Sequence, residues 1–223
     1  SIIRKSIPLN VVTPTLLDFE MLKVMGHTSA SVGHNFDELF VPFRCVASDV
    51  HGKNSVTFSK GNLNEAVRAS MTYPLYVNPI KIDGVIYFDG GMYNNFPSNV
   101  MCDDFSPDFI IGSNVSSNME LPDERDMFGV LRSMLTTPTN YDLACSDGIV
   151  IEAKTDIGVF EFERAKEAIE EGYKKTLAQI EEIEERIESK VDAKLMFVKR
   201  KKFRASLPEL KISSIETDNG KSK

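Results

Sequence analysis

Residues 80–95 read IKIDGVIYFDGGMYNN, a stretch that contains the dipeptide Asp-Gly twice. The first copy, Asp83-Gly84, separates two short runs rich in β-forming residues, 77–82 and 85–88. A two-residue Asp-Gly connection between such runs predicts a β-hairpin with a type I′ turn. Both central residues of that turn need a positive φ, which Gly adopts freely and Asp tolerates. The first copy therefore has a structural explanation and needs no chemical one.

The second copy, Asp89-Gly90-Gly91, comes at the end of the outgoing strand. Two consecutive glycines allow a sharp turn and the close approach of another segment or a ligand. A carboxylate at the end of a buried strand, followed by two residues without side chains, is within reach of a neighbouring group and suits a general base. A plain turn explains the same three residues, so the stretch alone leaves both interpretations open.

The rest of the chain alternates predicted strands with predicted helices. Strands, recognised by their apolar and β-branched residues, are expected at 40–50, 55–59, 108–115 and 146–152. Helices are expected at 97–102, at 123–135 and at 62–71, where Asn62 is the predicted N-cap. This alternation indicates an α/β fold in which helices cover the faces of a sheet.

The segment 163–191 has a different pattern and predicts one long amphipathic helix. Its apolar residues recur at spacings of three and four: Ala165, Ile169, Tyr173, Leu177, Ile180, Ile183, Ile187 and Val191. Glu and Lys dominate the other face. Such a helix packs its apolar stripe on its own domain or binds a partner, as in a coiled coil.

The composition limits the classes of function. The 223 residues are 42% hydrophobic and 26% charged, which is ordinary for a globular domain. The net charge of −7 argues against a general nucleic-acid-binding protein, so no nucleic-acid partner is expected. No apolar run reaches the roughly 18 residues of a membrane-spanning helix.

Cysteine and histidine give no sign of a metal or cofactor site. The three cysteines are far apart in sequence and form no C-x-x-C pair, which predicts buried free thiols at Cys45, Cys102 and Cys145. The histidines are expected on loops or turns, at His27, His34 and His51. Neither G-x-G-x-x-G nor G-x-x-x-x-G-K-[ST] occurs. We therefore expect no metal and no nucleotide cofactor.

Three sequence motifs surround Asp89 in a distinctive order: PFRCVASDV at 42–50, GNLNEAVRASMTYP at 61–74 and DGVIYFDGGMYNNFP at 83–97. Together with the predicted strand that follows them, these motifs resemble the C-terminal half of a patatin-like phospholipase domain. The matching positions are Gly61, Leu63, Ala66, Arg68, Ala69, Ser70, Pro74, Asp89, Gly90, Gly91, Asn95 and Pro97. The resemblance is good over residues 36–116 and looser over 146–177.

The resemblance implies a three-layer α/β/α fold and a lipid acyl hydrolase with a Ser-Asp dyad. In that family the Asp of the D-G-G motif accepts the proton of a Ser hydroxyl, which attacks an ester carbonyl. Asp89 matches this Asp, and Gly90 and Gly91 give the backbone room beside the nucleophile. Ser70 matches a structural position of the family. The implied substrate is a phospholipid or another acyl-ester lipid, and no cofactor is needed.

One departure from the family pattern is serious, because no Ser in this chain has Gly at both −2 and +2. The G-x-S-x-G elbow and the Gly-rich oxyanion segment are therefore not in these residues. We expect the chain alone to be inactive. It is part of a longer enzyme whose N-terminal strands are missing here, or a relative without catalysis that binds lipid or protein. In the first case, its stability requires the missing segment or self-association.

The last residues suggest a second unit. We divide the chain into residues 1–192, the C-terminal part of the patatin-like domain, and 193–223, a basic linker and the start of a following module. The stretch KRKKFRASLPELKISSIE at 199–216 resembles the junction with a POTRA module in bacterial proteins, which implies the cell envelope or secretion. The basic run 198–204 is a solvated connector or a contact with anionic lipid at a membrane surface.

Overall fold

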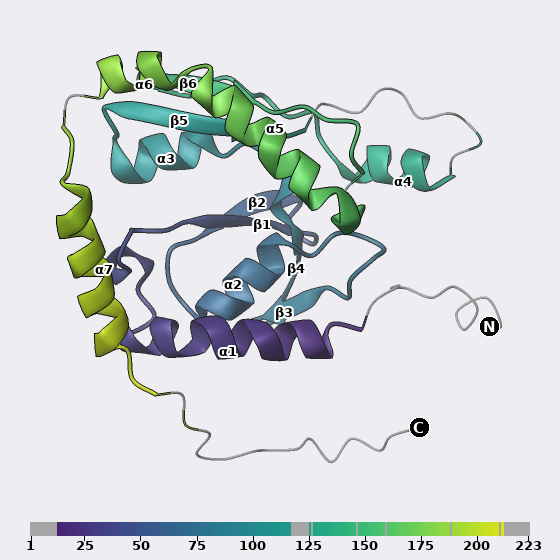
Figure 1. The fold of residues 1–223 in the computed structure, drawn as a ribbon. Coiled ribbons are helices and arrows are strands. Elements are labelled where there is room, and N and C mark those ends of the chain that lie inside the picture. Colours follow the sequence, from purple (N-terminus) through teal and green to yellow (C-terminus); the bar gives the residue numbers. More distant parts are fainter. Residues whose placement is uncertain are drawn as a thin grey trace.

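The computed structural model describes residues 13–116, 125, 127–145, 147–158, 160–187, 189–209 and 211. It confirms the predicted mixed α/β class, with helices flanking strands (Figure 1). Among the described residues the strands form two sheets, one in the order β2-β1-β4-β3 and the other consisting of β5 and β6. No described helix is both long enough and apolar enough to cross a bilayer.

The four-stranded sheet is antiparallel and is built from β1 (Cys45–Asp49), β2 (Asn54–Phe58), β3 (Ile80–Ile82) and β4 (Val85–Asp89). The β3–β4 hairpin confirms the first prediction, because φ is 49° at Asp83 and 87° at Gly84. The strand expected at 40–50 is shorter than predicted, since only its second half pairs with neighbours.

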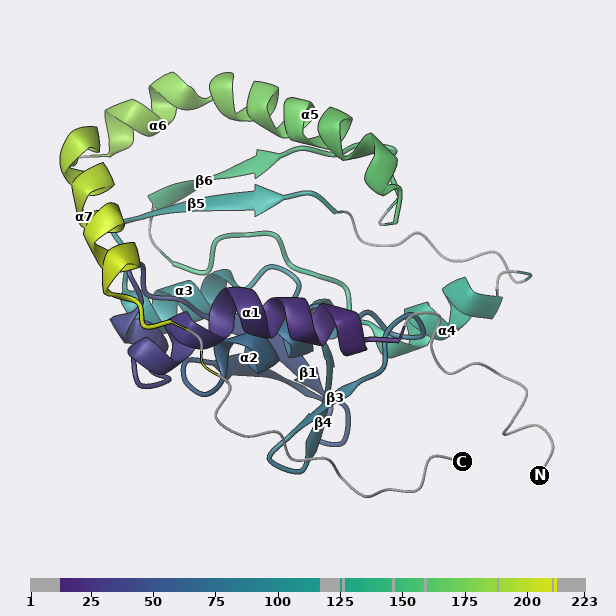
Figure 2. The ribbon, with the colours of Figure 1, turned by 60° about the horizontal axis from the view of Figure 1, so that its bottom comes forward.

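The second sheet pairs β5 (Phe109–Asn114) with β6 (Asp147–Glu152) in parallel. Both strands lie where the sequence predicts them. Helices α5 (Ala165–Leu177) and α6 (Ile180–Arg186) run along the outer side of this sheet (Figure 2). Ile183 of α6 is buried against Ile149 and Ile151 of β6, which fixes α6 on the sheet.

The remaining helices are α1 (Thr15–Ser31), α2 (Leu63–Ser70), α3 (Ser98–Phe105), α4 (Met127–Leu135) and α7 (Ala193–Ser206). Short 3₁₀ turns occur at Phe36–Glu38, Gly90–Met92 and Phe162–Arg164. Helices α2, α3 and α4 correspond to predicted segments, whereas α1 and α7 were not predicted. The α2 helix packs its alanines on the four-stranded sheet, where Ala69 joins Ala47 and Tyr87 in one buried cluster.

The prediction of one continuous helix at 163–191 is wrong. Two turn residues, 178 and 179, separate α5 from α6, and Ile187 is already extended, with φ −91° and ψ 109°. Tertiary contacts explain the difference, since Ile183 and Ile187 pack on the second sheet and Arg186 pairs with Asp147 of β6. The apolar stripe divides accordingly: Ile183 is buried, while the α5 side chains Ile169 and Tyr173 are 71% and 64% exposed.

The prediction of three free thiols is also wrong, because Cys102 and Cys145 form a disulfide with a Cα–Cα distance of 5.9 Å. The parallel register aligns Phe109 of β5 with Asp147 of β6, so the segments that precede the two strands come together. One cysteine lies in each of those segments. Only Cys45 matches the prediction, as a free and buried thiol.

Candidate active site

Asp89 is the last residue of β4, and its backbone is held from both sides. Its N–H donates to the carbonyl oxygen of Thr72 at 2.9 Å. Its own carbonyl oxygen accepts a hydrogen bond of 2.8 Å from the hydroxyl of Ser48 on the neighbouring strand β1. Thr72 and Ser48 are both fully buried. The position of the Asp89 backbone is therefore fixed by the protein interior.

The Asp89 side chain caps the 3₁₀ turn that follows it. Its Oδ1 accepts a hydrogen bond of 2.7 Å from the N–H of Gly91. Its second oxygen, Oδ2, accepts no hydrogen bond from any residue within the described ranges. Burial raises the pKa of the Asp89 carboxyl above its ordinary value, and the Gly91 hydrogen bond opposes that rise only partly. One oxygen is thus positioned, and the other is available to accept a proton.

Gly90 and Gly91 are explained by close contacts rather than by a special φ, because neither has a positive φ. A Cβ at Gly90 would lie 2.2 Å from the carbonyl oxygen of Val46 in β1. A Cβ at Gly91 would lie 2.6 Å from Oδ1 of Asn95 and 3.0 Å from Oδ1 of Asp89. Side chains at these two positions would push the turn away from β1 and crowd the carboxylate.

A buried arginine supports the segment that binds Asp89. Arg68 of α2 is only 3% exposed and donates to Asp18 Oδ1 of α1 at 2.7 Å, to the carbonyl of Asn78 at 2.8 Å and to the hydroxyl of Thr72. Through these three hydrogen bonds, Arg68 of α2 connects its helix to α1 and to the segment before β3. Sequence reasoning treated Arg68 only as a matching position and did not predict these contacts.

A second polar cluster connects the Asp89 turn to the end of β5. The side chain of Asn95 donates to the hydroxyl of Ser116 at 3.0 Å, and that hydroxyl lies 2.9 Å from the hydroxyl of Tyr141. The N–H of Ser116 donates to Asn114 Oδ1 at 3.0 Å. Asn95 therefore links the turn after Asp89 to the second sheet.

Two buried serines resemble nucleophiles by their neighbours, but both have structural roles. Ser48 donates to the backbone of Asp89, as described above. Ser29 lies 3.0 Å from Nδ1 of His34 and accepts from the N–H of Leu63 at 3.1 Å, at the start of α2. Ser29 thus caps α2, whereas the predicted cap, Asn62, makes no side-chain cap. The Ser29 side chain is only 1% exposed, so no substrate reaches its hydroxyl in this conformation.

The histidines lie in different elements of the fold. His34 lies in an exposed turn as predicted, whereas His27 lies within α1 and not in a loop. Among the residues that the structure describes, no three or more His, Cys, Asp or Glu side chains come together to form a metal site.

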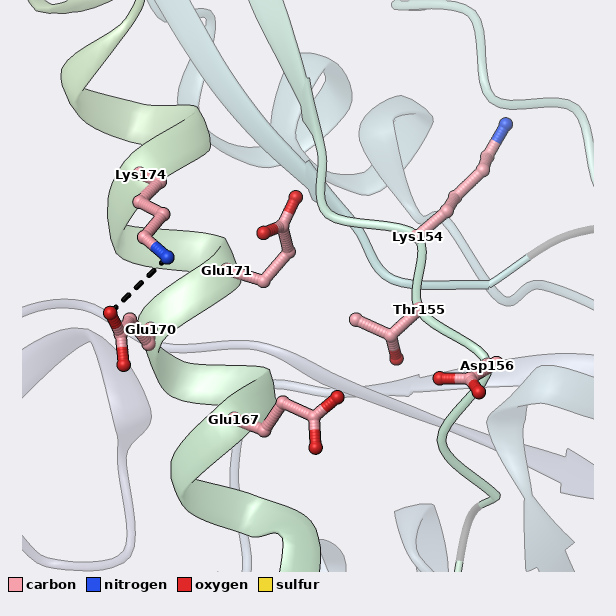
Figure 3. A pocket seen from close by; sticks show the side chains of 7 residues that line it. All are labelled: Lys154, Thr155, Asp156, Glu167, Glu170, Glu171 and Lys174. Carbon is pink, nitrogen blue, oxygen red and sulfur yellow. Dashed lines mark ion pairs between the residues drawn. The ribbon is translucent and has the colours of Figure 1, made fainter.

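A pocket lies between α5 and the segment after β6 (Figure 3). Its lining is strongly charged, with Glu167 and Glu171 on the helix and Lys154 and Asp156 on the facing segment. Lys174 pairs with Glu170 at 3.2 Å on the same helix. The elements that line this pocket differ from those that surround Asp89. Asp89 is not among the residues that line it.

Comparisons with known proteins match the part of the chain that contains Asp89. Residues 30–101, which include Asp89 and both glycines, match the family model described as patatin-like phospholipase. An uncharacterized NTE family protein of Mycobacterium tuberculosis is 36% identical over 61 residues, which cover 27% of this chain and 17% of that protein. A second uncharacterized NTE family protein, of Mycobacterium bovis, is 36% identical over 62 residues, or 28% and 11% of the two chains.

A more distant relative gives the longest of the alignments considered. An uncharacterized protein of Acanthamoeba polyphaga mimivirus is 30% identical over 95 residues, covering 43% of this chain and 30% of that protein. In all three cases the matched stretch spans less than a third of the relative's own length.

Proposed function

Because the chain is a member of the patatin-like phospholipase family, a family of lipid hydrolases, we propose that Asp89 is the general base of a Ser-Asp acyl hydrolase. The Ser and its oxyanion hole belong to a segment outside these 223 residues, since no G-x-S-x-G occurs within them. The chain alone is then inactive, and the intact enzyme hydrolyses a phospholipid or another acyl-ester lipid without a cofactor.

In this proposal, Asp89 transfers protons in two half-reactions. Its Oδ2, which accepts no hydrogen bond within the described residues, takes the Ser hydroxyl proton while the Ser oxygen attacks the ester carbonyl. The tetrahedral intermediate collapses, the proton passes to the leaving alcohol, and an acyl-enzyme remains. Asp89 then takes a proton from water, whose oxygen attacks the acyl group. The fatty acid leaves and the Ser regains its proton.

The observation that supports this role best is the contrast between the two carboxylate oxygens. Oδ1 is bound to the Gly91 N–H, which orients the group, while Oδ2 has no partner within the described residues. The raised pKa makes the carboxylate a stronger base than an ordinary Asp. Its backbone is held by Thr72 and Ser48, so the group is preorganised.

A second candidate function is a lipid- or protein-binding module without turnover. The Oδ1 contact favours it, because an Asp that caps the Gly90–Met92 turn is useful for folding even where no reaction occurs. This alternative predicts that the base has no nucleophile anywhere in the whole protein.

The coding DNA immediately upstream of Ser1 distinguishes the two functions. The hydrolase proposal predicts an in-frame Gly-rich segment followed by G-x-S-x-G. A stop codon or an unrelated domain at that place would contradict it and favour the binding module.

The proposal extends to location and stability. Export to the cell envelope or secretion is supported by the Cys102–Cys145 disulfide, because disulfides persist in oxidising compartments. Dependence on a missing segment or on self-association is supported by large apolar side chains at the surface, such as Leu16 at 72% and Met134 at 78% exposure. The division at residue 192 stays a prediction. The end of the POTRA-like stretch, residues 212–216, lies outside the described residues.

A further inference from the structure

Helix α7 differs in charge from the rest of the chain. Its sequence, AKLMFVKRKKFRAS, has six Lys or Arg residues and no acidic residue, whereas the whole chain has a net charge of −7. The helix lies at the edge of the molecule in both views (Figures 1 and 2). A cationic element in this position is accessible to a large partner.

One side of α7 is already occupied by the protein. The ring of Phe203 lies 5.6 Å from that of Phe40, and the Arg200 guanidinium lies 5.7 Å over the same ring. Residues of α1, including Val24 and His27, line the groove beneath these side chains. This packing fixes the rotation of α7 about its axis.

The opposite side of α7 combines lysines with apolar side chains. With about 100° of rotation per residue, Lys194, Phe197, Val198, Lys201 and Lys202 project from the half of the helix opposite Phe203. We call these five residues the α7 outer face. Phe197 is 69% and Val198 is 59% exposed. None of the three lysines forms an ion pair with a residue in the described part of the chain.

We propose that the α7 outer face docks on the surface of an anionic lipid bilayer. Lysines without acidic partners are attracted to anionic headgroups, and apolar side chains between them enter the boundary with the acyl chains. A nucleic acid would use the lysines but would leave Val198 and Phe197 without an apolar environment. The inference depends on α7 itself and goes beyond the proposed hydrolysis.

Vesicle flotation with the full chain tests this docking. The chain should float with phosphatidylcholine vesicles that contain about 30% phosphatidylglycerol and not with pure phosphatidylcholine. Raising the salt from about 0.05 M to about 0.5 M should weaken binding strongly, a readout that needs no variant. Equal binding to both vesicles, or binding insensitive to salt, would overturn the proposal.

Variants separate the outer face from overall charge. The triple variant Lys194→Gln, Lys201→Gln, Lys202→Gln should lose on the order of 100-fold in partitioning, since each basic residue contributes about fivefold. The matched control, Lys166→Gln, Lys174→Gln, Lys175→Gln on α5, removes the same charge and should change partitioning by less than about threefold. Similar losses in both triples would contradict a specific surface.

The apolar pair provides an independent test. Phe197→Ser with Val198→Ser keeps every charge and should lower partitioning at least tenfold, on the order expected for losing buried apolar area. Unchanged vesicle binding by this variant, or tighter binding of the chain to a duplex DNA oligonucleotide than to anionic vesicles, would show that the face does not enter lipid.

Discussion

The carbonyl oxygen of Thr72 accepts a hydrogen bond of 2.9 Å from the N–H of Asp89, so the segment directly after α2 holds the end of β4. Arg68 in turn binds the hydroxyl of Thr72 from one turn earlier in the chain. This contact gives a physical reason why the A-V-R-A-S motif and the D-G-G motif occur together: the first motif positions the backbone that bears the carboxylate of the second.

Replacing Arg68 should destabilise the fold more than an ordinary surface change. Arg68→Ala removes one buried and two partly buried hydrogen bonds, and we expect the free energy of unfolding to fall by about 3 kcal/mol. Urea denaturation measures this loss. Arg68→Lys keeps the charge but loses the planar fork, and should recover only part of the stability. If Arg68→Ala lowered the free energy of unfolding by less than about 0.5 kcal/mol, as surface substitutions do, the Arg68 hydrogen bonds would not support the fold as described.

Gly90 should tolerate no side chain, because its Cβ would collide with the backbone of β1. The 2.2 Å approach to the Val46 carbonyl predicts that Gly90→Ala lowers the free energy of unfolding by about 1–3 kcal/mol or more. Gly172→Ala in α5 is the control, since its Cβ has 4.0 Å of clearance and Ala favours helix by up to about 1 kcal/mol. Equal effects of the two substitutions would refute the close contact.

The raised pKa of Asp89 predicts a particular dependence of stability on pH. The folded chain binds the proton of the Asp89 carboxyl more tightly than the unfolded chain does. Protonated Asp89 therefore contributes its full stabilisation of the folded state at low pH. This stabilisation is lost as the pH rises from the ordinary Asp pKa through the raised folded value. Asp89→Asn keeps an acceptor for the Gly91 N–H but cannot ionise. Relative to the wild type, its stability should therefore improve as the pH rises.

Unfolding measured from acidic to neutral pH checks this difference. Asp83→Asn, in the exposed hairpin turn, is the control and should show no comparable trend. A difference between Asp89→Asn and the wild type that stays constant across this range would mean that Asp89 is not held in a desolvating environment.

The disulfide and the free thiol should respond differently to reagents. Reduction of Cys102–Cys145, which closes a loop with a sequence separation of 43 residues, should cost about 2–4 kcal/mol of stability. Burial raises the pKa of Cys45 to about 12, so its thiol should resist alkylation in the folded chain and react after unfolding. Peptide mass spectrometry measures the alkylation of Cys45 and detects the linked Cys102 and Cys145 peptides. Alkylation of all three cysteines in unreduced, denatured protein would exclude the disulfide.

Local features of the fold were predictable from sequence, whereas features set by tertiary contacts were not. The Asp83-Gly84 hairpin follows from two adjacent residues and the runs beside them. The disulfide depends on the parallel pairing of β5 with β6, which brings two distant segments together. Ser29 replaces Asn62 as the cap of α2 for the same reason, since the capping hydroxyl comes from another helix.

The candidate site shows the same division. Asp89 stood out because Asp-Gly-Gly at a strand end is a local signal. The roles of Ser48, Thr72 and Arg68 in holding it became visible only when β1 and α2 were placed against β4. No pattern along the chain distinguishes a buried Arg that bridges two helices from a solvated one.

The most direct test of the central claim is ester hydrolysis by the longest translated protein that contains this chain, comparing Asp89→Asn with Asp83→Asn. Both variants change an Asp that precedes Gly. Asp83 is exposed, whereas Asp89 is half-buried and its Oδ2 accepts no hydrogen bond from the described residues. A general base contributes about 10²–10⁴-fold, so Asp89→Asn should lower kcat by at least about 100-fold. Asp83→Asn should leave it unchanged. Full activity of the Asp89→Asn protein would contradict the dyad.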